Sequence, residues 1–461
     1  MSLVDPLVQQ RFSASTLALL AAVTAGVVAQ GGFYLPGRIV ASVLALVSLG
    51  LAVREGARFD RGLRWIAVTG AAIVLWAGVR AAMTGGWGTA GGIALSLLVL
   101  LAGVVVARRA SAADLATGLT GIGALVAVTG WAGVAWRIER WSVLVESTIW
   151  RAASTLTYPN AAAAVLAVAG LLALALLLAE PRSLGRAWVL YLILAGLGAT
   201  LSRAGGLAFA AGVLLFLIFA PVRQVLRHLA PALLGAGIAV AALVPSFPVA
   251  AEPDPLLALA GLAVGGLVAV HLPRLHGRWL AAAWGLVLAA AVGGLAFLLT
   301  RPLPARLEAV SRRRFTLDSR GRSGALRSAL DQAAAHPLLG SGPGQARYFW
   351  QDYSGQLVAS RWAHNEYLQW LVDLGAVGLV PLAALAVAIV VLLRRGRAGG
   401  ATPLLWTGAV AALAALAVHS AFDFLWELAV VPLLIGVLIG LAARSHGEEP
   451  SAPSINGEVP A

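Results

Sequence analysis

Long apolar stretches dominate the sequence, and they constrain the fold more than any other feature does. A helix rises about 1.5 Å per residue, so about 20 apolar residues cross the roughly 30 Å hydrocarbon core of a bilayer. Only 11% of the residues are charged, against about 25% in an average soluble domain. The sequence therefore predicts an all-α polytopic membrane protein with about 12–14 transmembrane helices. The fourteen candidate stretches lie near residues 13–30, 37–53, 64–83, 90–107, 114–136, 159–179, 186–201, 204–220, 228–247, 255–271, 279–300, 372–393, 402–420 and 424–443.

The arginines divide unevenly between alternate loops. With the N-terminus in the cytoplasm, 17 arginines fall in cytoplasmic segments, six in short outer loops and ten in the long polar segment after residue 300. Because basic residues in short loops resist translocation, both termini are predicted to be cytoplasmic. The first apolar stretch follows Asp5 and Arg11 without a convincing cleavage site, so we expect a retained helix. The predicted regions are transmembrane helices in 1–300 and 372–443, a large external loop containing short helices at 301–371, and a disordered cytoplasmic tail at 444–461.

The composition disfavours several kinds of chemistry. There is no cysteine, so disulfides, thiol nucleophiles and cysteine-bound metals are not available. All 33 basic residues are arginines scattered in ones to threes, which argues against nucleic-acid binding. Glu252 and Asp254 are the only closely spaced carboxylates in the short outer loops, and such a pair is more typical of a solvated turn than of a metal site. We therefore expect no metal and no cofactor.

Three polar features join the large loop on the predicted outer side. The turn Leu201–Gly206 places Arg203 at or just below the membrane surface. The loop Arg137–Tyr158 carries three arginines and two tryptophans, and Trp136 directly precedes it, which predicts an interfacial amphipathic helix. The connection His419–Asp423 joins the last two apolar stretches. These features predict that a polar face is assembled on this side of the membrane.

Arginines are the candidate ligands for an anion. An arginine in the membrane costs about 2.5–3.5 kcal/mol, so Arg203 needs a partner or an anionic ligand. It can snorkel, form an ion pair, or bind a phosphate together with the amides of Gly205 and Gly206 at the start of the next helix. Guanidinium groups bind phosphate through paired hydrogen bonds, so the arginines of the large loop could form an anion cradle. The candidates are Arg301, Arg312–Arg314, Arg320, Arg322, Arg327 and Arg347.

The large loop has a recognisable local pattern. A helical segment is expected over Gly324–Ala335 and should end at His336-Pro337, because proline cannot continue a helix. Three glycines and a proline in residues 338–345 then predict a turn with accessible backbone amides. His364 follows, just before the apolar run that re-enters the membrane. Its imidazole suits either a general base near neutral pH or a buried structural role.

Three polar residues are further candidates for substrate contact or orientation. Asn365 and Glu366 stand beside His364 and could orient its ring or a substrate hydroxyl. Asn160 begins an apolar stretch from the outer side, where it could cap the helix or contact a sugar, and capping is the favoured alternative.

In this order, these segments resemble the bacterial O-antigen ligase and polymerase superfamily, whose members transfer glycans from polyprenyl diphosphate. The resemblance covers roughly residues 155–440. Leu326 departs from it, because relatives often carry a tryptophan four residues after the loop arginine, and this leaves the choice between Arg320 and Arg322 open. The chain also lacks the soluble repeat domain of some protein-directed relatives. The segments that carry the resemblance are Tyr158-Pro159-Asn160, Leu201–Gly205, Arg322, His336–Gly344 and Ala363–Gln369.

The resemblance implies a fold like that of the GT-C glycosyltransferases and metal-independent transfer of a lipid-linked glycan. It implies that Arg203 and Arg322 hold the diphosphate and that His364 activates the acceptor. It also implies a multi-pass protein of the bacterial inner membrane, with its active site facing the periplasm or exterior. The expected partners are a polyprenyl-diphosphate-linked glycan, a glycolipid or growing-glycan acceptor, and the lipid bilayer.

This mechanism is chemically consistent, because the donor carries a good leaving group and arginine can neutralise the departing diphosphate. His364 would take the proton of the acceptor hydroxyl, with inversion at the anomeric carbon. A ligase and a polymerase differ only in the acceptor, and both remain open. A protein O-oligosaccharyltransferase and a lipid or glycan transporter are less favoured. A transporter is expected to carry polar sites at mid-membrane, whereas these polar groups cluster on one face.

Overall fold

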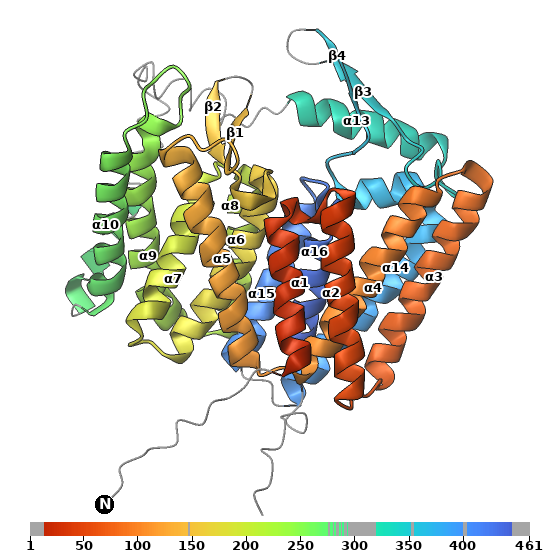
Figure 1. The fold of residues 1–461 in the computed structure, drawn as a ribbon, viewed down its shortest axis with the longest axis horizontal. Helices are drawn as coiled ribbons and strands as arrows, with labels where there is room; N and C mark the ends of the chain where they lie inside the picture. Colours follow the sequence, from red (N-terminus) through yellow and green to blue (C-terminus); the bar gives the residue numbers. More distant parts are fainter. Residues whose placement is uncertain are drawn as a thin grey trace, which may run out of the picture.

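Figure 1 shows the computed structural model of the chain. It describes residues 13–145, 148–274, 320–351, 355–399 and 403–444, with isolated positions between 277 and 293. The apolar stretch near 279–300, the large loop before residue 320 and the tail after Arg444 lie outside this part, and so do the side chains of Arg320 and Arg322.

Apolar helices make up most of the described part. Eight are long and apolar enough to cross a membrane, and five shorter apolar helices accompany them. Each overlaps a stretch predicted from the sequence, so the all-α polytopic membrane fold is confirmed. They are α1 (Ala14–Val28), α2 (Leu35–Arg54), α3 (Arg61–Thr84), α4 (Trp87–Arg109), α5 (Ala112–Ala135), α6 (Pro159–Ala179), α7 (Leu184–Ala199), α8 (Arg203–Phe219), α9 (Val222–Leu243), α10 (Pro255–His271), α14 (Glu366–Ala398), α15 (Pro403–Ser420) and α16 (Val430–Ala442).

Helix α6 forms the centre of one half of the bundle. Its residues from Pro159 to Leu178 are all buried, and α5, α7, α8 and α15 pack around it. Elsewhere glycines let helices approach closely, as small residues do in membrane bundles. A Cβ at Gly436 of α16, for example, would meet the backbone of Leu100 in α4. Packing of this kind provides the core of a chain that has no disulfide.

The connections between helices sort onto two opposite faces. One face, here called the hairpin face, carries two β-hairpins and the helix α13 (Arg320–Ala335), and these lie together at the top of Figure 1. Hydrogen bonds and ion pairs join loops that lie on the same face. Arg137 donates to the carbonyl of Pro248 at 2.6 Å on the hairpin face, and Arg108 pairs with Asp60 at 2.9 Å on the opposite face. The alternation seen in the arginines therefore appears in the structure as two distinct loop faces.

The prediction of an amphipathic helix in the loop Arg137–Tyr158 is wrong. The loop instead contains β1 (Ser142–Val145) and β2 (Ile149–Ala152), paired antiparallel with Ser142 opposite Ala152. Aliphatic and β-branched residues favour this pairing. The N–H of Trp150 also donates to the carbonyl of Phe247 at 2.8 Å. The connection between α9 and α10 therefore adds backbone hydrogen bonding to the edge of this hairpin.

The large loop lies against the break in α14. As predicted, α13 ends just before His336-Pro337, and a second hairpin follows with β3 (Tyr348–Gln351) and β4 (Leu357–Ser360). Helix α14 begins at Glu366, before the predicted start of the span at residue 372. It breaks at Gly375, whose φ of 67° and ψ of −176° suit only glycine.

Candidate functional site

His364 lies on the hairpin face immediately before α14. Its backbone is left-handed, with φ of 52°, which is unusual for a residue that carries a side chain. The next residue, Asn365, caps α14 by accepting a hydrogen bond from the N–H of Leu368 at 3.1 Å. The imidazole is 26% exposed and packs edge-on against Phe424, with ring centroids 5.1 Å apart. The ring is therefore positioned and still accessible, as a reacting group must be.

Asp423 is the principal further candidate, because the sequence placed it on the polar face but gave it no role. It follows α15 and is completely buried, and its Oδ1 lies 3.5 Å from Nδ1 of His364. The hydroxyl of Tyr158 and the amide of Asn160 donate to its carboxylate, and the N–H of Phe424 donates to Oδ1. A carboxylate held in this way can fix the tautomer of the histidine and stabilise its protonated form. The signal that could have found Asp423 was a lone acidic residue between two apolar stretches.

Asn160 connects this carboxylate to the start of α8. Its Nδ2 donates to Asp423 Oδ2 at 2.5 Å, and its Oδ1 accepts from Ser202 at 2.9 Å and from Arg151 at 3.2 Å. The favoured expectation that Asn160 caps α6 is wrong, because it lies inside the first turn and makes no capping bond. It is buried, and its hydrogen bonds join Asp423 to Ser202 and Arg151.

Arg203 is the first residue of α8 and is exposed on the hairpin face. It lies at the rim of an apolar groove of about 770 Å³ between α7, α8 and α9. The amides of Gly205 and Gly206 are not available to a phosphate, contrary to expectation. The N–H of Gly205 already donates to the side-chain oxygen of Ser202, which caps the helix, and the N–H of Gly206 donates to the carbonyl of Ser202. An anion at this helix end would therefore be held by the guanidinium of Arg203.

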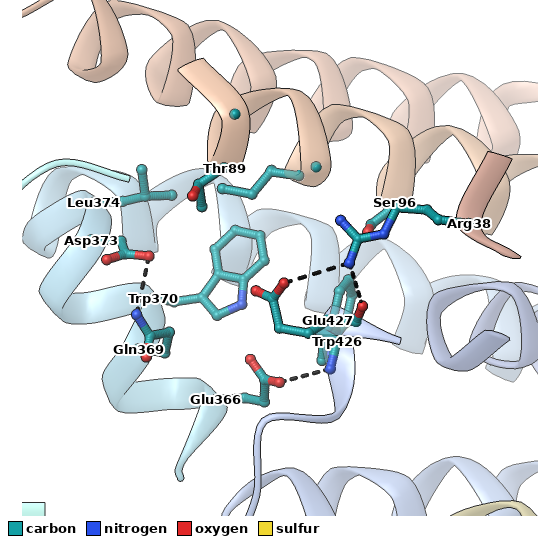
Figure 2. Close-up of a pocket in the computed structure, with 13 residues that line it drawn as sticks. Arg38, Thr89, Ser96, Glu366, Gln369, Trp370, Asp373, Leu374, Trp426 and Glu427 are labelled. Atoms are coloured by element: carbon teal, nitrogen blue, oxygen red, sulfur yellow. Dashed lines mark hydrogen bonds and ion pairs between the residues drawn. The ribbon is translucent and has the colours of Figure 1, made fainter. Parts of the chain in front are cut away.

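The two neighbours of His364 do not orient its ring. Asn365 is the helix cap, and Glu366 is buried on another side of the helix, where Oε1 accepts from the N–H of Trp426 at 2.7 Å. Glu366 faces a second cavity, shown in Figure 2, that also contains Glu427. Burial raises the pKa of Glu427, and the nearby guanidinium of Arg38 lowers it in part.

The other loop arginines are placed as follows. The backbones of Arg320 and Arg322 lie in the first turn of α13, and their assignment as phosphate ligands stays a prediction. Arg327 is exposed on the same helix. Arg347 is also exposed, and its guanidinium donates to the carbonyls of Gly344 and Ala346, so it stabilises the glycine-rich turn. The other candidate ligands, Arg301 and Arg312–Arg314, lie outside the described residues.

Only one residue of the acidic pair in the short outer loop has a structural role in the described part of the chain. Asp254 caps α10 by accepting from the N–H of Leu257 at 2.9 Å, and Glu252 is exposed. Within the described residues, no three histidine, aspartate or glutamate side chains come close enough to share a metal ion.

These observations define a polytopic α-helical membrane protein whose histidine, buried carboxylate and helix-terminal arginine gather on one face. Residues 256–383 match the family model described as O-antigen ligase. The matched region includes α10, the large loop and His364, so the resemblance to the O-antigen ligase and polymerase superfamily is confirmed. At the level of the family, the match indicates an O-antigen ligase-like membrane glycosyltransferase. A search of the curated proteins finds no match.

Proposed function

We propose that the protein transfers a glycan from a polyprenyl-diphosphate donor to an acceptor hydroxyl, with inversion and without a metal ion. The observation that carries the proposal is one continuous network of side chains. His364 faces Asp423, Asp423 accepts from Asn160, and Asn160 accepts from Ser202, which caps the helix that begins at Arg203. A chain of hydrogen bonds thus joins the carboxylate that lies 3.5 Å from the candidate base to the start of the helix that carries the candidate diphosphate ligand.

The groove beside Arg203 supports a lipid donor. It is lined mainly by leucine, valine, alanine and glycine side chains of α7, α8 and α9, and it ends at the guanidinium. An isoprenoid chain matches such a lining, and a diphosphate matches the arginine at its end. A water-soluble nucleotide sugar offers no apolar part to fill the groove, so the geometry favours a membrane-bound donor.

In the proposed reaction, the acceptor oxygen attacks the anomeric carbon while the bond from that carbon to the diphosphate breaks. Nε2 of His364 takes the hydroxyl proton, and the carboxylate of Asp423, 3.5 Å from Nδ1, stabilises the imidazolium. The departing polyprenyl diphosphate keeps the bonding electrons. Arg203 meets its charge, and by the family resemblance Arg322 does so as well.

The test uses purified protein in detergent or liposomes with a polyprenyl-diphosphate-linked glycan and a lipid-linked acceptor. We expect transfer that is insensitive to a chelator and is lost in His364→Ala. A single product would indicate a ligase, and a ladder of lengths would indicate a polymerase. Full transfer by His364→Ala would rule out the proposed base, and complete loss with the chelator would rule out metal independence.

We also propose that the hairpin face is the periplasmic or external face of the bacterial inner membrane, with both termini in the cytoplasm. The excess of arginine on the opposite face supports this orientation. A topology reporter inserted after Pro343, in the glycine-rich turn, should report an external location. A cytoplasmic signal there would overturn the orientation.

A further inference from the structure

A second cavity of about 240 Å³ lies beside the first two turns of α14. Helix α14, the starts of α2 and α4, and the short helix η5 (Leu425–Glu427) enclose it (Figure 2). Three carboxyl groups line this cavity, those of Glu366, Asp373 and Glu427, together with Arg38 and the indole of Trp370. We call it the carboxyl cavity. The proposed reaction uses none of these residues.

Two of the carboxyl groups are buried with hydrogen-bonding capacity to spare. Asp373 is 5% exposed, and its Oδ2 accepts from Gln369 at 3.2 Å, whereas Oδ1 has no hydrogen-bond partner among the described residues. Glu366 is 4% exposed and accepts one bond, from the backbone of Trp426. Neither forms an ion pair in the described part, because Arg38 lies against Glu427, at 3.8 Å. A buried acceptor without a donor costs about 1–3 kcal/mol, so these groups favour a ligand that donates hydrogen bonds.

The spacing of the carboxyl groups selects the kind of ligand. Glu366 and Asp373 are seven residues apart on one helix, which places them about 10 Å apart along its axis. They surround the cavity instead of converging on one point, as a single ion would require. A sugar ring carries hydroxyl donors around its edge, and its C–H face can pack on an aromatic ring. The indole of Trp370 stands between Glu366 and Asp373 and could receive that face. The volume is below the roughly 300–1,000 Å³ of drug-sized sites, so it suits one ring.

The position of the cavity relates it to the acceptor. The segment from Asp423 to Glu427 separates it from the reaction centre, because Asp423 faces His364 and Trp426 is bonded to Glu366. Arg203, the proposed diphosphate ligand, belongs to α8, which contributes nothing to this cavity. His364 therefore lies between the proposed donor site at Arg203 and the carboxyl cavity.

We propose that the carboxyl cavity binds one sugar ring of the acceptor glycan. The inference rests on the proposed transferase function. The carboxyl groups of Glu366 and Asp373 would accept hydrogen bonds from the ring hydroxyls, and Trp370 would pack against its apolar face. Binding there would hold the acceptor while a hydroxyl further along the glycan reaches His364.

Glycine substitutions in α4 provide a matched test. Gly92 lines the cavity, and a Cβ there would meet only Nη1 of Arg38, at 3.7 Å, so Gly92→Leu fills the space without removing a carboxyl group. Gly91, its neighbour, is exposed and does not line the cavity, and nothing lies within 4 Å of a Cβ there. We expect Gly92→Leu to raise KM for the acceptor about tenfold or more, with KM for the donor unchanged. Gly91→Leu should change neither. An unchanged acceptor KM in Gly92→Leu, or a raised donor KM, would overturn the proposal.

A second measurement does not depend on transfer. The chain has no cysteine, so Ser96→Cys places a single thiol in the cavity, and Gly91→Cys places one outside it. A methanethiosulfonate reagent should label both. A panel of methyl glycosides should slow labelling of Ser96→Cys alone, and inorganic diphosphate should slow neither. No labelling of Ser96→Cys, no protection by any glycoside, or protection by diphosphate would each overturn the inference. Protection without any transfer would instead count against the proposed function and leave the sugar site standing.

Discussion

Replacing Asp423 by asparagine should disable the site while keeping its shape. The two oxygens of the carboxylate accept from different donors. Oδ2 accepts from Asn160 and Tyr158, and Oδ1 accepts from Tyr158 and from the N–H of Phe424 while facing Nδ1 of His364. An amide has only one oxygen. In either orientation, its NH₂ group must therefore face an N–H group, that of Asn160 or that of Phe424.

The cost of Asp423→Asn follows from this geometry. At least one hydrogen bond to a buried charged group is lost, which costs about 1.5–3 kcal/mol of stability. The effect on catalysis should be larger. Without the negative charge, Nδ1 of His364 no longer favours the protonated state, so Nε2 is no longer kept as the proton acceptor. A general base contributes about 10²–10⁴-fold to rate, and we expect kcat to fall about 100-fold or more.

The assay is a double-mutant cycle on glycan transfer by purified protein, with thermal unfolding in detergent as the measure of stability. If Asp423 acts through His364, the double variant Asp423→Asn/His364→Gly should be no slower than His364→Gly alone. Asp254→Asn is the control, because Asp254 lies on the same face and only caps α10. Wild-type kcat in Asp423→Asn, or losses that simply multiply in the double variant, would refute the coupling.

Three further predictions follow from the same geometry. His364→Gly should lose about 10²–10⁴-fold in transfer rate without loss of thermal stability, because its φ of 52° favours glycine, and a drop in stability would contradict this. Arg203→Gln should raise KM for the donor about tenfold, as measured by initial rates against donor concentration. Replacing the exposed Arg140 by glutamine should leave this KM unchanged, and equal effects of the two substitutions would indicate bulk electrostatics instead of a phosphate contact. Gly375→Ala should destabilise the protein by about 1–3 kcal/mol or more in thermal unfolding, because the backbone of the glycine-rich turn occupies the space that a Cβ would need. Gly78→Ala should be tolerated, because nothing lies within 4 Å of a Cβ there. Equal melting temperatures of the two variants would contradict the close contact at Gly375.

The sequence was a good guide to the helices, because the length and apolarity of a stretch are local properties. The loop Arg137–Tyr158 shows where local reasoning fails. Its tryptophans and arginines fit an interfacial helix, but the β1–β2 hairpin is extended by the backbone of Phe247, which is far away along the chain. Pairing of that kind cannot be read from the composition of one loop.

The site was predictable only where a short motif carried it. His364 stands in such a motif, and the structure places its Nδ1 3.5 Å from a buried carboxylate, while its role as the base stays a prediction. Asp423 was missed because its role depends on contact between α6 and the end of α15, which brings Tyr158 and Asn160 to it. The amides proposed to bind phosphate after Arg203 were misjudged for the opposite reason. Their partner, the neighbouring cap residue Ser202, is local and could have been recognised.

The break in α14 explains how the loop residues before the helix are held in place. A helix that breaks leaves backbone groups without partners, and in a membrane each one is costly. Here the backbone of the glycine-rich turn supplies the missing hydrogen-bond partners. Ala376 N donates to Pro337 O at 2.9 Å, and Ser341 N donates to Val372 O at 2.7 Å. Arg80 of α3 donates to the carbonyl of Gly340 at 2.9 Å and ties the turn to the bundle.

The same arrangement fixes the residues on either side of His364. Ala363 N donates to the side chain of Gln369 at 2.9 Å, and Gln369 in turn donates to Asp373 just before the break. Asn365 caps the helix from the other side of the histidine. The left-handed backbone of His364 is thus held between two anchored neighbours, and sites built on such rigid elements keep their geometry better than sites on free loops. Because Asp373 both anchors this motif and faces the carboxyl cavity, a sugar bound there would contact the framework that positions the base.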